Sequence, residues 1–188
     1  GVFLNRSIFT PFNKKSSIYL RLSRDRDLKN QDIQDRPIAM LGENSKTKVR
    51  CHLKYSLNKR IVLKNRIASV FTRNTSHSRG VMIYQDICYR SKNNAFGFDF
   101  RYALFDAKDY ESRIYAYENN VLYMFSVPAY YGRGYRTYLN LKYRYRNTNW
   151  YLKIGRTGYS DREVIGTGLN QINGNGKTNI NFQVRLRF

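Results

Sequence analysis

The segment Thr178–Phe188, "TNINFQVRLRF", alternates apolar and polar residues to the last position of the chain. Its apolar residues are Ile180, Phe182, Val184, Leu186 and Phe188, and its polar residues are Asn179, Asn181, Gln183, Arg185 and Arg187. Successive side chains of a β-strand point to opposite faces of the sheet. This segment is therefore predicted to form a strand with one apolar face and one strongly polar face.

The same alternation recurs along the chain, most clearly in residues 48–57, 96–104, 135–146 and 150–154 and more weakly near residue 20. Residues 60–72 and 80–90 are less regular. The nearly continuous apolar stretch 113–127 is expected to form one strand or two pieces around Glu118–Asn120. With short turn signals between the segments, we predict an antiparallel meander of about eight or nine strands, each of about ten residues.

Two long polar stretches, residues 24–45 and 160–177, are expected to be loops. The first of them suggests a division of the chain at residue 45. Residues 1–45 would form an N-terminal strand and a polar loop, and residues 46–188 would form the main set of antiparallel strands. The chain begins without Met, so we expect a processed product or a piece of a larger protein.

The charge of the chain is strongly basic. It carries 34 Lys and Arg against 13 Asp and Glu, a formal net charge of +21 over 188 residues. A charge of this size implies an acidic partner, such as nucleic acid, anionic lipid headgroups or an acidic polypeptide segment. Aromatic residues make up 15% of the chain, and most of them are Tyr and Phe, which favour strands and wet–dry boundaries.

The two faces of the strands favour a membrane β-barrel. Strands of about ten residues with an apolar lipid face and a polar inner face are what such a barrel needs. A soluble sheet with one solvated face shows the same alternation. The terminal aromatic residue favours the barrel, because outer-membrane barrels commonly end on an aromatic residue that the insertion machinery recognises. The predicted insertion signal is Ile180, Phe182, Val184, Leu186 and Phe188.

We therefore predict an all-β fold, an antiparallel transmembrane β-barrel or the C-terminal portion of a larger one. Leu139, Leu141 and Tyr143 should face lipid together with the apolar residues of the last strand. Basic residues on the opposite faces should point into the lumen: Lys48, Arg50, Lys54, Arg101, Arg136, Lys142, Arg144, Arg146, Lys153, Arg185 and Arg187. They would select anions in an open pore, pair with acidic groups of an absent or separate plug, or contact lipid phosphates at the rim.

No residue pattern indicates catalysis, so we expect neither an enzyme nor a bound cofactor or metal. The loop Ser160–Glu163 lacks the arrangement of a catalytic triad. Asp106, Asp109, Glu111 and Glu118 are close in sequence, and pairing with lumen arginines is favoured over a calcium site. Cys51 and Cys88 fall on opposite strand faces, which disfavours a disulfide.

Three longer stretches carry a resemblance to a known family. They are "IYQDICY", "RYALFDAKDYESRIYAYENNVLYMFSVPAYYGRG" and "SDREVIGTGLNQINGNGKTNI". Residues 46–188 resemble the C-terminal barrel region of Bacteroidota helix-hairpin-helix domain-containing outer-membrane proteins. The helix-hairpin-helix part, which is associated with DNA binding, has no counterpart in this sequence. The resemblance implies a bacterial outer-membrane location and a barrel fold.

The expected role is passage through the outer membrane or anchoring of an envelope assembly. The expected partners are outer-membrane lipid and lipopolysaccharide, the barrel insertion machinery and other envelope proteins or a missing N-terminal part. The main alternative is a basic RNA-binding, ribosome-associated β-protein, in which the cations would contact phosphates. Another is a soluble periplasmic β-domain, which requires the apolar face to be buried.

Overall fold

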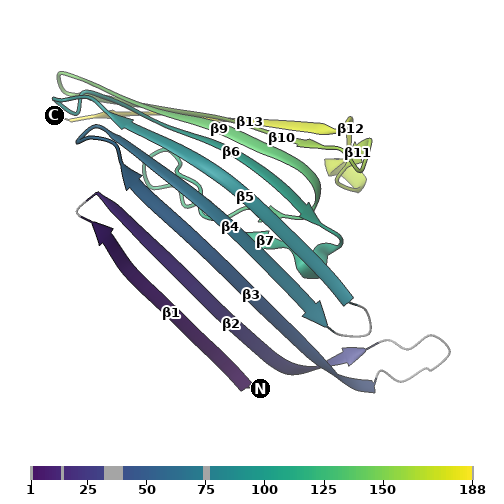
Figure 1. Cartoon of the computed structure of the whole chain (residues 1–188). Coiled ribbons are helices and arrows are strands. Elements are labelled where there is room, and N and C mark those ends of the chain that lie inside the picture. Colours follow the sequence, from purple (N-terminus) through teal and green to yellow (C-terminus); the bar gives the residue numbers. More distant parts are fainter. Residues whose placement is uncertain (1, 14, 32–39, 74–76, 188) are drawn as a thin grey trace.

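A computed structural model describes residues 2–13, 15–31, 40–73 and 77–187. Its main element is a nine-stranded antiparallel sheet (Figure 1). The strands, in their order across the sheet, are β1 (Val2–Asn13), β2 (Ser16–Gln31), β3 (Met40–Ser56), β4 (Ile61–Arg73), β5 (His77–Arg90), β6 (Phe96–Ala107), β9 (Gly132–Tyr145), β10 (Thr148–Tyr159) and β13 (Gly176–Leu186). The prediction of an all-β antiparallel meander is confirmed, because each strand pairs with the next of these in the chain.

The connections between strands differ at the two ends of the sheet. One end carries short turns, such as residues 57–60, 91–95 and 146–147. The other end carries the connections 108–131 and 160–175, and the latter contains the two-residue strands β11 (Val164–Ile165) and β12 (Ile172–Asn173) and a 3₁₀ turn, η2 (Gly168–Asn170). The edge strands are β1 and β13, which are not paired with each other in the described residues. Closure into a barrel is therefore not seen.

The strands are longer than predicted, and two of them extend into the stretch expected to be a loop. Their lengths run from 11 to 17 residues. β2 continues to Gln31 and β3 starts at Met40, so only residues 32–39 of the predicted loop 24–45 lie outside the described strands. The expected boundary at residue 45 falls within β3. The strand was not recognised in the sequence because Arg and Asp residues alternate in this stretch, so that both faces of the strand are polar there.

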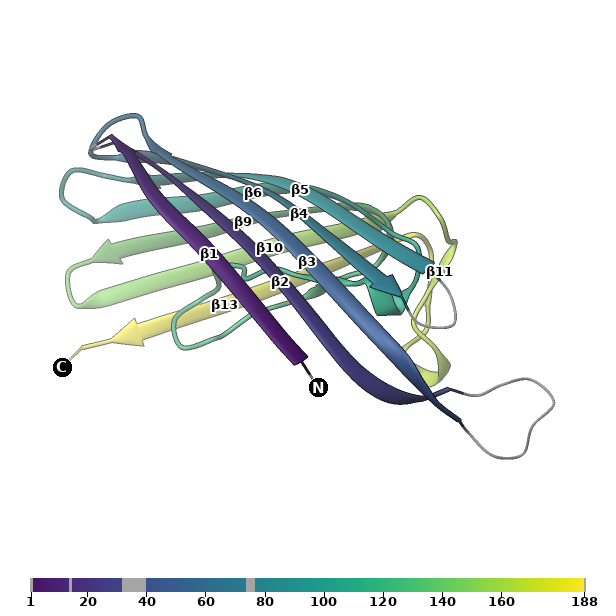
Figure 2. The same ribbon diagram turned by 60° about the horizontal axis from the view of Figure 1, so that its bottom comes forward.

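A second difference concerns the apolar stretch 113–127, which forms no strand of the main sheet. The chain between β6 and β9, residues 108–131, instead folds against one face of the sheet, and we call it the inner segment. It contains a 3₁₀ turn, η1 (Tyr110–Ser112), and a small ribbon of β7 (Ile114–Tyr115) and β8 (Ala129–Tyr130). Figures 1 and 2 show the sheet curving around this segment.

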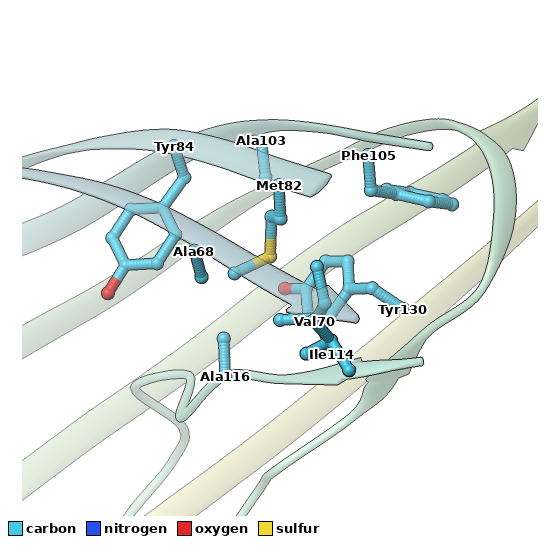
Figure 3. Packing of buried hydrophobic residues seen from close by; sticks show 9 residues of the cluster. All are labelled: Ala68, Val70, Met82, Tyr84, Ala103, Phe105, Ile114, Ala116 and Tyr130. Carbon is cyan, nitrogen blue, oxygen red and sulfur yellow. The ribbon is translucent and has the colours of Figure 1, made fainter. Parts of the chain in front are cut away.

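A small apolar cluster attaches the inner segment to the sheet. Ile114, Ala116 and Tyr130 of the segment pack against residues of β4, β5 and β6 (Figure 3). The sheet residues of the cluster are Ala68, Val70, Met82, Tyr84, Ala103 and Phe105. Ala103 is fully buried and Met82 is 1% exposed. Burial of these side chains holds the inner segment against β4, β5 and β6.

Within the described residues, no helix is both long and apolar enough to cross a membrane.

Candidate functional site

The candidate site is the concave face of the sheet, which we call the inner face. Strand register defines it, because residues directly opposite each other on paired strands share a face. Arg101 lies opposite Asp86 on one side and Tyr138 on the other. The same pairing places Lys48, Arg50 and Lys54 of β3 and Lys142 and Arg144 of β9 on this face, together with Arg136, Lys153 and Arg185.

Glu118 of the inner segment is the centre of a buried charge network. Its side chain is fully buried, and it forms ion pairs with Arg136 at 3.0 Å and with Lys153 at 2.9 Å. Arg136 donates through both Nε and Nη2, so its guanidinium binds both carboxylate oxygens. The Tyr130 hydroxyl donates to Oε1 at 2.8 Å. One carboxylate therefore pairs with two cations that come from two neighbouring strands.

The charge state of Glu118 follows from these partners. Burial alone would raise the pKa of Glu118, but the hydrogen bonds and positive charges of Arg136 and Lys153 outweigh burial and lower the pKa to about 2. The same environment raises the pKa of Tyr130, first through burial and then through the Glu118 charge. Glu118 is thus ionised at neutral pH, and Tyr130 is a neutral donor.

A second ion pair lies beside the first. Arg101 binds both oxygens of Asp86, with Nε–Oδ1 at 2.5 Å and Nη2–Oδ2 at 2.7 Å. Its Nη1 donates to the Tyr117 carbonyl, and its guanidinium lies 3.7 Å from the centre of the Tyr84 ring. Both side chains of the ion pair are almost fully buried. A planar guanidinium suits this site, because it serves a carboxylate, a carbonyl and a ring at once.

The inner segment is also fixed at its N-terminal end. Asp109 caps the η1 turn by accepting a hydrogen bond from the Ser112 backbone N–H. The Ser112 carbonyl lies so close to Gly80 of β5 that a Cβ there would be 2.2 Å from it. Lys46 of β3 donates to the Glu111 carbonyl. The segment is therefore attached to β3, β5 and the β9–β10 pair.

The remaining predicted lumen residues lie near the ends of the strands. Arg144 donates to Asn149, and Arg185 donates to the Tyr123 hydroxyl of the inner segment. Arg146 is not on a strand. It occupies the turn after β9 with a left-handed backbone, and its guanidinium lies over the Tyr145 ring. Arg187 follows the end of β13 and is exposed.

The opposite face of the sheet, which we call the outer face, is apolar and exposed. Ile180 is 64% exposed, Phe182 is 62% exposed and Leu186 is 58% exposed. Register places the predicted lipid-facing residues together on this face: Leu139, Leu141, Tyr143, Phe182, Val184 and Leu186. Of the predicted insertion signal, Ile180 also lies here, and Phe188 lies outside the described residues.

Aromatic side chains gather on the outer face at the end of the sheet that carries the short turns. Trp150 and Phe182 have ring centres 6.0 Å apart, and Tyr143 and Tyr145 are stacked at 6.5 Å. Tyr89 of β5 forms a further group with Phe96 and Phe98 of β6. Such a band is typical of the boundary between lipid and water.

No group of three or more His, Cys, Asp or Glu side chains within the described residues could hold a metal ion. The predicted pairing with arginines is confirmed for Glu118, and Asp106 pairs with Arg133 in an exposed position. Cys51 and Cys88 are free thiols on opposite faces, as predicted.

Sequence reasoning did not identify Glu118 as the central residue. It expected Glu118 to pair with a lumen arginine only as one of four acidic residues, and it placed the acidic groups of a plug in an absent or separate segment. In the structure Glu118 pairs with two cations, and Asp86 of β5 supplies a further carboxylate from within the chain. The available signal was the isolated Glu118 inside an apolar and aromatic stretch, because such a carboxylate needs a buried cation.

A comparison with known proteins found no match: no family model, no curated protein and no solved structure matches this chain.

Proposed function

We propose that this chain forms the wall of a β-barrel in a bacterial outer membrane and anchors an envelope assembly there, with the inner segment acting as a plug. The observation that carries the proposal is the placement of charge. Lys153 of β10 is 1% exposed and Glu118 is fully buried. Ile180 and Phe182 lie on β13, which pairs with β10, and both side chains are more than half exposed. This distribution is the reverse of a soluble protein and suits a sheet between lipid and a polar interior.

Two further features support a membrane location. The aromatic residues at the turn end of the outer face would lie at the lipid headgroups. The strands of 11 to 17 residues are long enough to span the hydrocarbon core when tilted. The resemblance of residues 46–188 to Bacteroidota outer-membrane proteins agrees with this location and is part of the proposal.

The proposal places a requirement on the edge strands. A strand edge in lipid leaves backbone N–H and C=O groups unsatisfied, each at a cost of several kcal/mol. β1 and β13 lie at the two edges of the sheet, and in the described residues each pairs with a strand on one side only. In the membrane these edges must therefore pair, either with each other or with strands of another polypeptide segment.

Passage of solutes is a second candidate function, because the inner segment does not neutralise every cation of the inner face. It contacts mainly β4–β6 and β9–β10, whereas Arg50 and Lys54 of β3 have no ion pair within the described residues. Single-channel recordings separate the two functions. The anchoring role predicts no conductance, and passage predicts an anion-selective conductance.

The test of the membrane location is fractionation of the native host cells. The protein should sediment with outer membranes, resist extraction by urea and migrate differently on a gel before and after boiling. Release by urea together with association with ribosomes would support the RNA-binding alternative instead, in which the cations contact phosphates.

A further inference from the structure

The inner face of β2, β3 and β4 carries a group of cations that the chain does not neutralise. Register places Arg21 directly opposite Arg50, and Lys54 directly opposite Lys64. Arg66 lies between these pairs, opposite His52. We call Arg21, Arg50, Lys54, Lys64 and Arg66 the cation cluster. Like charges directly opposite each other on neighbouring strands destabilise a sheet, so this arrangement is unfavourable without a counter-charge.

The carboxylates near the cluster are already engaged. Asp86 lies opposite Lys64, but both of its oxygens accept hydrogen bonds from Arg101. Asp25 pairs with Lys48 at 2.7 Å. None of the five cluster residues forms an ion pair with another described residue, and Arg21 instead donates to the Asn5 side-chain oxygen.

Arg66 is the most informative member of the cluster. Its guanidinium lies 5.2 Å from the centre of the Tyr84 ring, which orients it, and its Nε is buried with no hydrogen-bond partner in the part of the chain that is described. A buried donor of this kind is unfavourable unless an acceptor reaches it. A guanidinium positioned on one side by an aromatic ring is well placed to bind an oxyanion.

We propose that the cation cluster binds a soluble ligand that carries two or more phosphate groups. A diphosphate carries several negative charges and acceptor oxygens, so it would neutralise a large part of the cluster within a small volume. Neighbouring strands lie about 4.8 Å apart and alternate residues along a strand lie about 7 Å apart. A diphosphate therefore reaches side chains from all three strands. Lipid headgroups are excluded, because the inner face lies opposite the outer face that meets lipid.

This inference rests on the proposed function only in the assignment of the outer face to lipid. The experiment is isothermal titration of inorganic diphosphate into the full chain folded in zwitterionic detergent micelles. Saturable binding is expected. Removing two guanidinium groups in Arg50→Gln/Arg66→Gln should weaken it roughly tenfold or more, because hydrogen bonds to charged groups are the strong ones.

The matched control is Arg146→Gln/Arg187→Gln, which removes the same charge from a turn and from the chain beyond β13. Its affinity should stay within about twofold of the parent, because charges distant from a site act weakly in salt. If Arg50→Gln/Arg66→Gln does not fold, Lys54→Gln/Lys64→Gln serves in its place. Equal weakening by the control would show unspecific charge attraction and overturn the site.

Two other results would also overturn the proposal. One is the absence of diphosphate binding by the parent. The other is tighter binding of hexaglutamate, which would identify the cluster as a surface for an acidic polypeptide. Neither result affects the membrane location, which is tested separately by quenching of Trp150 fluorescence from within the bilayer.

Discussion

Replacing Glu118 with Gln tests whether the inner segment is held by charge. The substitution keeps the shape of the side chain and removes the one carboxylate that binds both Arg136 and Lys153. Lys153 is then a buried cation without a counter-charge. Removing one partner of a buried ion pair costs about 3–5 kcal/mol, because the remaining charge stays desolvated.

The lowered pKa of Glu118 gives an independent value for the stabilisation that its ion pairs provide. The ordinary value for Glu in an unfolded chain is 4.5, and the folded value is about 2. This difference corresponds to a stabilisation on the order of 3 kcal/mol. Because the folded pKa is the lower one, the stabilisation is fully present above pH 4.5 and is lost progressively as the pH falls toward 2. This stabilisation is similar to the cost expected for breaking a buried ion pair.

The assay is urea unfolding in detergent micelles, followed by the fluorescence of Trp150, for the parent and for Glu118→Gln. The variant should lose about 3 kcal/mol at pH 7, and the difference from the parent should shrink at low pH. Asp106→Asn is the matched control, because the Asp106–Arg133 pair is exposed and such pairs contribute about 1 kcal/mol or less. A loss for Glu118→Gln no larger than that of the control would refute the reasoning.

Three further predictions concern the two faces. Leu141→Arg should destabilise the protein in lipid vesicles by about 2–4 kcal/mol if the residue lies near the bilayer midplane, and an unchanged unfolding midpoint would argue against a lipid-facing position. Gly80→Ala should make residues 108–131 more sensitive to protease, because the new methyl group would collide with the Ser112 carbonyl; unchanged cleavage would contradict the described packing. A lipid-soluble thiol reagent should modify Cys51 on the outer face well before the buried Cys88, and the reverse order would contradict the assignment of faces.

The alternation of side chains could be read from the sequence, and it predicted the faces of the sheet. Lys153 and Ile154 are adjacent in the chain, and they lie on opposite faces with exposures of 1% and 42%. The pairing of β13 with β10 agrees with the predicted meander, because β10 is the preceding long strand of the chain. These features are local, because they depend on a period of two residues and on neighbouring strands.

The inner segment could not be predicted in the same way. Its apolar stretch lacks a period of two, so a strand and a packed loop looked alike. The ion pairs of Glu118 join residues 18 and 35 positions apart in the chain, and no local pattern marks such a distance. The outer half of the β2–β3 hairpin was missed for another reason, since charged residues occupy both faces of it and remove the alternation.

The central claim is that the apolar outer face meets lipid, and Trp150 tests it most directly. It is the only tryptophan of the chain, and it is 42% exposed on the outer face near the short turn between β9 and β10. The measurement is quenching of its fluorescence in vesicles, with bromine placed at different depths of the acyl chains and with iodide in the water. The account predicts strong quenching by bromine near the headgroups, weaker quenching by bromine at the bilayer centre and little by iodide. Efficient quenching by iodide with none by the brominated lipids would contradict it.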